Sequence, residues 1–340
     1  MRRSLKAGDD GMAGRYGPHN PDETYVAHRY PEQLFDTGEL RLNYAAAGEA
    51  ASPALLLIPA QTESWWGYEA AIDLLKDRFQ VFAVDLRGQG RSGRTPGRYT
   101  LDNMGGDLVR FIQGVIGRPA VVSGLSSGGV LAAWLSAYAP PGLVRAACYE
   151  DPPLFASETT PACGHSIRHA VGPIFAMWAK YLGDQWSVGN WAGMAANAAE
   201  ELPPWLTGFQ PPDEPPQSLK EYDPEWGRAF WTGSVGASCD HGRMLAAVKV
   251  PVLLTHHFRH WDETKGFCLG AISDLQAGRV RELVEAAGQP FDYRSFPQMG
   301  HAMHSQDPQL FAATLSEWAL ALPPASQAPW ATAGSAASSS

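Results

Sequence analysis

The sequence predicts an α/β fold, a mostly parallel doubly wound sheet with a helical cap inserted between two of its strands. Three observations predict it. Short apolar runs typical of strands alternate with amphipathic helical patterns over most of the 340 residues. Several runs are apolar without interruption, as is typical of parallel strands covered on both faces. The alternation stops once, in a long helical and proline-rich stretch, which indicates an insertion.

The elements of the core follow one another in strand–helix order. Strands are expected at 40–44, 54–58, 81–84, 120–122, 144–149, 250–255 and 291–296. Amphipathic helices are expected at 101–117, 128–138 and 309–320. Thr100 precedes the first of these helices, where its hydroxyl can cap the free amides of the first turn.

The interruption defines a cap between residues 152 and 247. Within it, one helical face is apolar, and six of the twelve tryptophans of the chain lie in this segment. That face consists of Ile167, Val171, Ile174, Phe175, Trp178 and Tyr181. The alternative is a second packed helical layer without a pocket. The expected plan is an N-terminal arm at 1–22, a core at 23–151 and 248–322, the cap at 152–247 and a disordered tail at 323–340.

Composition narrows the class of protein. Hydrophobic residues make up 45% and charged residues 18%, which is enough apolar sequence for a sizeable core. The net charge of −9 and the absence of a basic stripe argue against nucleic acid and anionic membranes as partners. We expect no signal peptide, because no apolar stretch follows Met1-Arg2-Arg3, and no apolar run of about 20 residues occurs. The four cysteines lack metal-ligand spacing. We expect a cytoplasmic protein with reduced thiols.

The segment SGLSSGG, residues 123–129, carries the strongest chemical signal. Gly124, Ser126 and Gly128 fit the pattern G-x-S-x-G, after an expected strand and before an expected helix. A turn this sharp strains the central residue, and small neighbours relieve the crowding. It also projects the serine hydroxyl above the sheet, at the positive end of a helix. Ser126 is therefore the predicted nucleophile.

A serine nucleophile needs a base to accept its proton, and the base is expected after a late strand. The segment FDYRSFPQMGHAMH ends a strand and continues into a loop. His301, directly after Gly300, is the expected base. His304, three residues further along, is the rival.

The acid that orients the base has more than one candidate. The strand at 250–255 is the usual place, but His260 stands where an Asp would fall and Asp262 comes slightly late. The preceding strand ends in CYEDPP, which offers Glu150 and Asp151. We expect Glu150 to orient His301, with Asp262 as second choice. Asp151, next to Pro152, is expected to shape the turn into the cap.

Two backbone amides should stabilise the oxyanion of the reaction. One is expected from Ser127, directly after the nucleophile, and the other from Gln61, in the loop PAQTES after an early strand. No metal and no cofactor are expected. The cluster of His256, His257, His260 and Asp262 lacks the helical i, i+4 spacing of a paired metal site.

With these residues in place, the chain resembles the α/β-hydrolase superfamily over roughly residues 35–322. The segments IPAQTES, DLRGQGRSG, SGLSSGG, CYEDPP and QMGHAMH come in the family's order. Within the superfamily the chain resembles the zearalenone lactonases, through its Leu-Ser-Ser-Gly motif, its C-x-E-x-P segment at Cys148 and the cap segment PEWGRAF. The resemblance implies an α/β-hydrolase fold, a triad of Ser126, Glu150 and His301, and substrate contact by Trp226.

The expected function is a cofactor-free serine hydrolase that opens a lactone, with zearalenone or a similar bulky aromatic ester as substrate. A general esterase and a C–C bond hydrolase share the same catalytic residues and remain alternatives. A slow-turnover small-molecule receptor of the same fold is an alternative from another class. The expected partner is a small apolar ester, and the N-terminal arm and abundant aromatic residues are compatible with a homodimer.

Overall fold

The sheet of the predicted core has eight strands. In the computed structural model, which describes residues 24–182, 189–203, 206, 211–263 and 266–323, they follow the order β1-β2-β4-β3-β5-β6-β7-β10. The antiparallel pairs are β1 with β2 and β2 with β4, and all other neighbours are parallel. The strands are β1 (Glu32–Asp36), β2 (Arg41–Ala47), β3 (Ala54–Ile58), β4 (Gln80–Val84), β5 (Ala120–Leu125), β6 (Val144–Glu150), β7 (Val252–His256) and β10 (Phe291–Ser295).

Helices cover both faces of this sheet, as the continuous apolar runs predict. One layer holds α2 (Glu69–Leu75), α11 (Met303–Gln306) and α12 (Pro308–Ala321), which contact one another. The other holds α3 (Leu101–Phe111), α4 (Ser127–Tyr138), α9 (His241–Ala246) and α10 (Asp274–Ala286). A π-helical turn, η3 (Ile112–Ile116), extends α3, and a short 3-10 turn, η2 (Trp65–Tyr68), precedes α2.

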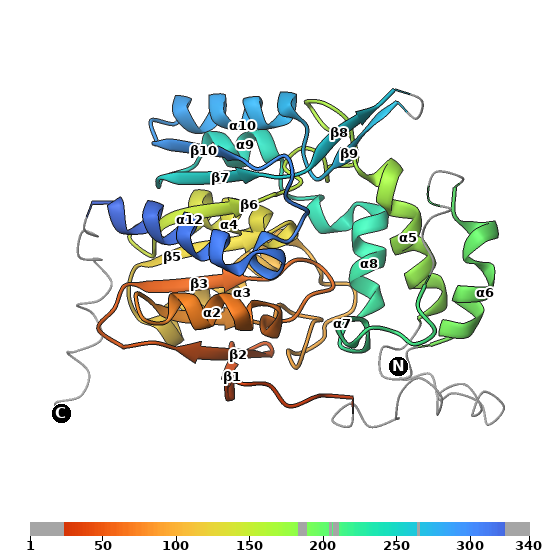
Figure 1. The fold of residues 1–340 in the computed structure, drawn as a ribbon, viewed down its shortest axis with the longest axis horizontal. Coiled ribbons are helices and arrows are strands. Elements are labelled where there is room, and N and C mark those ends of the chain that lie inside the picture. The colour runs from red at the N-terminus through yellow and green to blue at the C-terminus, as the bar shows by residue number, and fades with distance from the viewer. Residues whose placement is uncertain (1–23, 183–188, 204–205, 207–210, 264–265, 324–340) are drawn as a thin grey trace.

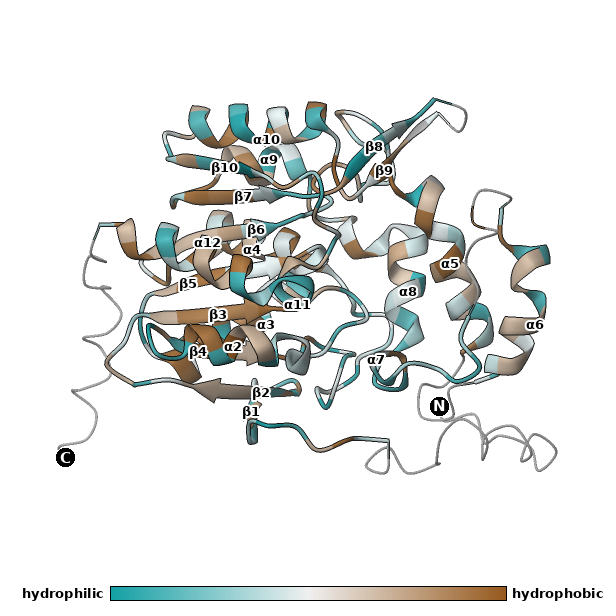
Figure 2. Cartoon of the chain, in the orientation of Figure 1, coloured by the Kyte–Doolittle hydropathy of each residue, from teal (hydrophilic) through white to brown (hydrophobic). Residues whose placement is uncertain are grey.

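Burial explains why the central strands read as continuous apolar runs. All residues of β3 and of β5 are buried, and alternate side chains feed two hydrophobic clusters on opposite faces of the sheet. Figure 2 shows the hydrophobic colour concentrated on these strands and on the inner sides of the helices. The doubly wound parallel sheet is confirmed.

The helical insertion is also confirmed. Between β6 and β7 lie α5 (Arg168–Tyr181), α6 (Trp191–Glu201), α7 (Gln217–Lys220), α8 (Pro224–Thr232), the 3-10 turn η5 (Ser234–Gly236) and α9. Figure 1 shows α5 to α8 gathered beyond one end of the sheet, whereas α9 lies within the core layers. A two-stranded hairpin, β8 (Arg259–Asp262) and β9 (Phe267–Gly270), projects on the same side after β7.

The expected arm at 1–22 and all but the first residue of the expected tail at 323–340 lie outside the described residues, as do Trp186 and Trp205 of the cap. Within the part of the chain that the structure describes, every helix is too short or too polar to cross a bilayer.

Candidate active site

The turn between β5 and α4 holds Ser126 in a strained conformation. Its φ of 54° and ψ of −118° lie in a region that side chains rarely adopt. The turn closes tightly, because a Cβ on Gly124 would lie 2.1 Å from the Gly128 carbonyl oxygen and a Cβ on Gly128 would lie 2.3 Å from that of Ile58. The Ser126 amide donates to the Glu150 carbonyl at 2.9 Å, which fixes the turn to β6.

His301 lies in the loop after β10 and pairs with Asp151. The His301 Nδ1 and the Asp151 Oδ2 are 2.7 Å apart, and the histidine lines the same cavity as Ser126. Asp151 follows β6 directly and has a φ of 40°, which turns its buried carboxylate toward the histidine. The Oδ1 of the same carboxylate accepts a hydrogen bond from the His257 amide at 3.1 Å.

The expected hydrogen bond between Glu150 and His301 is not formed. Glu150 belongs to β6 itself, so its side chain points to the opposite side of the chain from that of Asp151. Both Glu150 carboxylate oxygens lie 3.3 Å from the Nδ1 of His304, and the His304 amide donates to one of them at 3.1 Å. The rival base is therefore buried with the expected acid, and His301 takes Asp151, the residue expected only to shape the turn.

The second candidate acid lies on another element. Asp262 ends β8 and faces Phe267 across the hairpin, which places it outside the pair formed by Asp151 and His301. Neither neighbouring histidine offers a free ring nitrogen to a metal. The His256 ring lies 2.9 Å from the Tyr293 hydroxyl and 2.8 Å from the Ile272 carbonyl. The His257 ring contacts the Thr255 hydroxyl and the carbonyls of Gly300 and His301, each at 3.0 Å.

The pairing sets the proton affinity of His301. Desolvation by the surrounding cavity acts to lower the pKa of its imidazole, but the hydrogen bond and the negative charge of Asp151 outweigh that effect, so the pKa lies above its ordinary value. A neutral His301 that gains a proton is thus stabilised by the carboxylate behind it. This is the arrangement that a general base requires.

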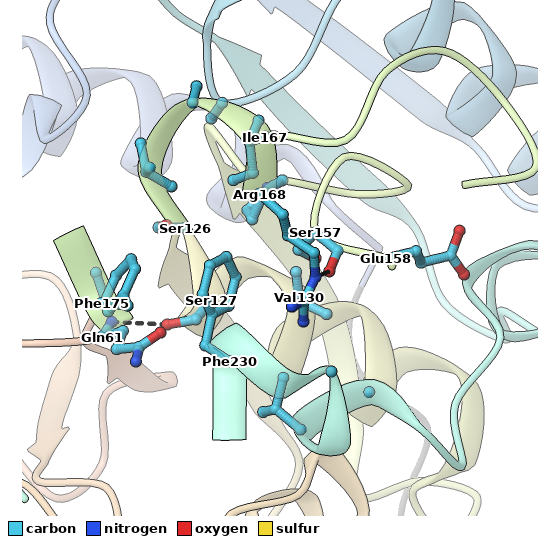
Figure 3. A pocket seen from close by; sticks show the side chains of 18 of the residues that line it. Gln61, Ser126, Ser127, Val130, Ser157, Glu158, Ile167, Arg168, Phe175 and Phe230 are labelled. Atoms are coloured by element: carbon cyan, nitrogen blue, oxygen red, sulfur yellow. Dashed lines mark hydrogen bonds between the residues drawn. The ribbon is translucent and has the colours of Figure 1, made fainter. Parts of the chain in front are cut away.

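The two expected oxyanion donors lie together. The Gln61 amide donates to the Ser127 hydroxyl at 2.7 Å, as the dashed line in Figure 3 marks. The Ser127 amide begins helix α4, where no preceding helical turn offers it a carbonyl. The Gln61 side chain is held by the Tyr222 hydroxyl at 2.6 Å, so it is engaged with the cap.

A cavity of about 800 Å³ lies between these residues and the cap. Its wall is mainly apolar and includes Val171, Ile174, Phe175 and Trp178 from the predicted apolar face of α5. Trp226 also lines it, and this side chain is 1% exposed and stacks on Tyr99. Figure 3 shows Gln61, Ser126, Ser127, Phe175 and Phe230 around this space.

Two residues of this arrangement were not predicted in their observed positions. Asp151 has no sequence signal that separates it from Glu150, because the positive φ that turns its carboxylate toward His301 is unusual for a non-glycine residue. His257 reaches the site twice, through its amide to Asp151 and through its ring to the loop of His301. The only sequence signal of His257 is its place at the end of a parallel strand. The sequence suggests it otherwise only as a metal ligand, and the spacing argues against that role.

Comparison with known proteins places the chain among hydrolases. A model described as the alpha/beta hydrolase family matches residues 55–314. The 3-oxoadipate enol-lactonase 2 of Acinetobacter baylyi is 29% identical over 102 residues, which are 30% of this chain and 38% of that protein. Human epoxide hydrolase 4 is 33% identical over 125 residues, 36% of this chain and 34% of the relative. These matches span little more than a third of the length of each curated relative.

Solved structures match over most of the chain. The enol-lactonase of Burkholderia xenovorans LB400 has a TM-score of 0.60 at 18% identity and covers 85% of this chain and 100% of its own. An esterase of a Rhodococcus species has a TM-score of 0.57 at 21% identity and covers 86% of this chain and 99% of its own. At these identities the likeness shows the fold, and it is the one that the sequence predicts.

Proposed function

Because this chain belongs to the alpha/beta hydrolase family, we propose that it is a serine hydrolase of carboxylic esters that opens lactones of bulky apolar compounds. The observation that carries the proposal is the pairing of His301 with Asp151, 2.7 Å apart, in a cavity that also holds a strained serine. A serine, an imidazole and a buried carboxylate in this relation are the parts of an acyl-transfer site.

The proposed reaction begins at the substrate carbonyl. Ser126 attacks the carbonyl carbon while His301 takes the hydroxyl proton, and Asp151 stabilises the imidazolium that forms. The amides of Gln61 and Ser127 donate to the oxyanion. His301 then protonates the leaving alkoxide, which in a lactone stays attached to the acyl chain. Water, deprotonated by His301, hydrolyses the acyl-enzyme and restores Ser126.

The cavity supports a bulky apolar substrate. Its volume of about 800 Å³ is in the range of sites for drug-sized ligands, and aromatic side chains of α5 and α8 line it. Lactone opening is supported by the resemblance to the zearalenone lactonases and by the enol-lactonase among the relatives. Zearalenone is therefore the first macrolactone to test.

The chemistry of the nucleophile speaks against an epoxide as the substrate, although epoxide hydrolases are among the relatives. A serine that opened an epoxide would remain bound through an ether, which water does not cleave under these conditions. A serine that attacks an ester remains bound through an ester, which the same His301 can help water to hydrolyse. Ser126 thus favours esters.

The test is hydrolysis of a panel of aryl esters and lactones, both neutral and with a free carboxylate, zearalenone included, with the products identified by mass spectrometry. Ser126→Ala is expected to lower kcat by about 10⁴-fold or more. Ser127→Ala is the matched control and is expected to stay within about tenfold of the wild type, because Ser127 contributes its backbone amide. Hydrolysis that survives in Ser126→Ala, or its absence from the wild type over the whole panel, would contradict the proposal.

A further inference from the structure

Arg168 is a buried cation in the wall of the cavity. It is the first residue of α5, its exposed fraction is 8%, and it lines the same space as Ser126 and His301. Its guanidinium lies over the ring of Phe230, 4.7 Å from the ring centroid. Burying a guanidinium costs several kcal/mol of solvation unless a partner compensates it, so its partners decide what it does.

The partners that Arg168 has are neutral. Its Nε donates to the Ser157 carbonyl at 3.1 Å and its Nη1 to the Trp231 carbonyl at 2.8 Å. Among the described residues, no carboxylate forms an ion pair with it. Burial lowers the pKa of this guanidinium, and no charged group of the described residues opposes that effect. The positive charge is therefore uncompensated.

The acidic groups that line the cavity form no ion pair with Arg168 in the described part of the chain. Glu63 accepts from the Ala60 amide, Asp151 from His301, Glu158 from the His241 amide and Asp240 from the Arg243 amide. Glu158 is close to Arg168 in sequence, but Figure 3 shows its carboxylate directed away from the guanidinium. None of these groups takes the place of an anion beside Arg168.

The third guanidinium nitrogen of Arg168 and the hydroxyl of Thr159 both lie beside Gly233. Around Gly233, the Arg168 Nη2 and the Thr159 hydroxyl lie 3.7 and 2.4 Å from the position that a Cβ would occupy. Both residues line the cavity. A guanidinium edge with a hydroxyl close by matches the oxygen atoms of a carboxylate.

We propose that Arg168 determines specificity by binding a free carboxylate of the substrate, at a distance from the ester that Ser126 attacks. This inference rests on the proposed hydrolase function and narrows its substrate class to esters or lactones that carry a second, anionic acid group. The apolar wall of α5 and α8 holds the chain between the two groups. The carboxylate supplies the charge that the protein itself does not place beside Arg168.

The experiment compares two esters that differ only in this charge. They are the mono(4-nitrophenyl) ester of adipic acid and the same compound with its free carboxylate methylated. The wild type is expected to prefer the acid by about 10- to 100-fold in kcat/KM, the effect of a charged hydrogen bond. Arg168→Gln is expected to remove this preference, so that the acid and its methyl ester have similar kcat/KM values.

Further variants, and esters of diacids of different length, distinguish substrate binding by Arg168 from a purely structural role. Arg168→Lys keeps the charge without the fork and is expected to retain part of the preference. Arg228→Gln, an exposed arginine of α8 that pairs with Glu225, is the matched control and should retain all of it. Corresponding esters of succinic, glutaric and suberic acid should show one optimum length, set by the separation of Arg168 from Ser126.

Two outcomes would overturn the inference while the proposed function stands. One is a wild type that hydrolyses both adipate esters equally well. The other is Arg168→Gln lowering both rates by the same factor, which would make Arg168 a clamp between Ser157 and Trp231. If the wild type hydrolyses neither ester, binding of monomethyl adipate against neutral dimethyl adipate, measured by calorimetry, tests Arg168 by itself. Monomethyl adipate should then bind to the wild type about tenfold or more tightly than the dimethyl ester, and equal affinities would overturn the inference.

Discussion

Two adjacent carboxylates of one strand end serve two different histidines. Glu150 faces His304 inside the core, and Asp151 faces His301 at the cavity. The sequence shows both acids and both histidines but not which one pairs with which, because the pairing depends on a single residue of strand register. Asp151 also adopts a positive φ, which the sequence does not reveal for a non-glycine residue.

Exchanging each carboxylate for its amide separates the two roles. Asp151→Asn is expected to lower kcat by about 10³- to 10⁴-fold with a small change in stability, because His301 loses its orienting acceptor. Glu150→Gln is expected to lower the free energy of unfolding by about 3 kcal/mol, since it leaves His304 buried without its charged partner. Initial rates on an aryl ester and urea unfolding measure the two effects. The reverse ranking of activity would return the catalytic role to Glu150.

The raised pKa of His301 fixes the acid side of the rate profile. The base works only when neutral, so kcat/KM is expected to fall as the pH drops through the pKa of His301, above the ordinary value of about 6.5. In Asp151→Asn the raising effect is gone, and the acid limb should move to lower pH. Rates of both forms from pH 5 to 9 measure the shift. A limb at the same pH in both forms would show that Asp151 does not act on the titrating group.

At the scale of elements, α8 joins the cap to the core. Its N-cap, Asp223, accepts from the Glu225 amide and from the Tyr99 hydroxyl, and the Asp223 amide donates to the Gly88 carbonyl. The helix that carries Trp226 is therefore attached at its first turn to the segment between β4 and α3. A substitution at this attachment is therefore expected to weaken substrate binding.

Removing the N-cap side chain of α8 is expected to raise KM. Asp223→Ala should cost about 1–2 kcal/mol of stability and raise KM severalfold, because α8 lines the cavity. Asn190→Ala is the matched control: its side chain caps α6 through the Gly193 amide, and the described residues of α6 do not line the cavity. It should cost similar stability with KM unchanged. Thermal unfolding and steady-state kinetics measure both, and equal KM values in the two variants would contradict the role of α8.

The strands that the sequence does not predict, β1, β8 and β9, share one physical reason for being overlooked. The expected strand at 54–58 coincides with β3, in which every residue is buried and apolar. The edge strand β1 has a mostly exposed pattern, so it gives no apolar run, and it is held by pairing with β2. The hairpin of β8 and β9 is likewise polar on β8, and the sequence predicts no strand there. The local hydrophobic pattern predicts buried strands. It does not predict exposed strands that are held mainly by hydrogen bonds to a neighbouring strand.

At the scale of the whole molecule, the order of motifs along the chain was enough to predict the sheet, the insertion and the edge at which the site lies. In parallel sheets that edge is where the loops after successive strands meet. The separation and orientation of side chains at that edge could not be predicted, because they depend on packing among distant segments. Arg168 is an example: in the sequence it is an ordinary residue at the start of a helix, and only the fold brings Phe230 and Trp231 into contact with it.

One buried histidine links pH to the stability of the whole fold. The His241 Nδ1 accepts from the Phe155 amide at 2.9 Å, and burial lowers its pKa to about 4. The unfolded chain binds this proton below about pH 6.5, so stability is lost as the pH falls from 6.5 toward 4, by about 3 kcal/mol in all. His241→Asn keeps an acceptor without a titrating group and should flatten this loss. His165→Asn, at an exposed position, is the control, and equal pH slopes for the wild type and His241→Asn would contradict the assignment.

The hydrogen bond from the Gln61 amide to the Ser127 hydroxyl has a consequence for selectivity. In the structure the Ser127 hydroxyl accepts this hydrogen bond, so the Gln61 amide is not left unsatisfied. An incoming carbonyl exchanges one oxygen for another, so the swap is nearly neutral in energy and the hydroxyl only has to rotate. Ethers and hydrocarbons of the same shape have no carbonyl oxygen at that point, so the Ser127 hydroxyl keeps its hydrogen bond. Such compounds should occupy the cavity without becoming aligned for attack.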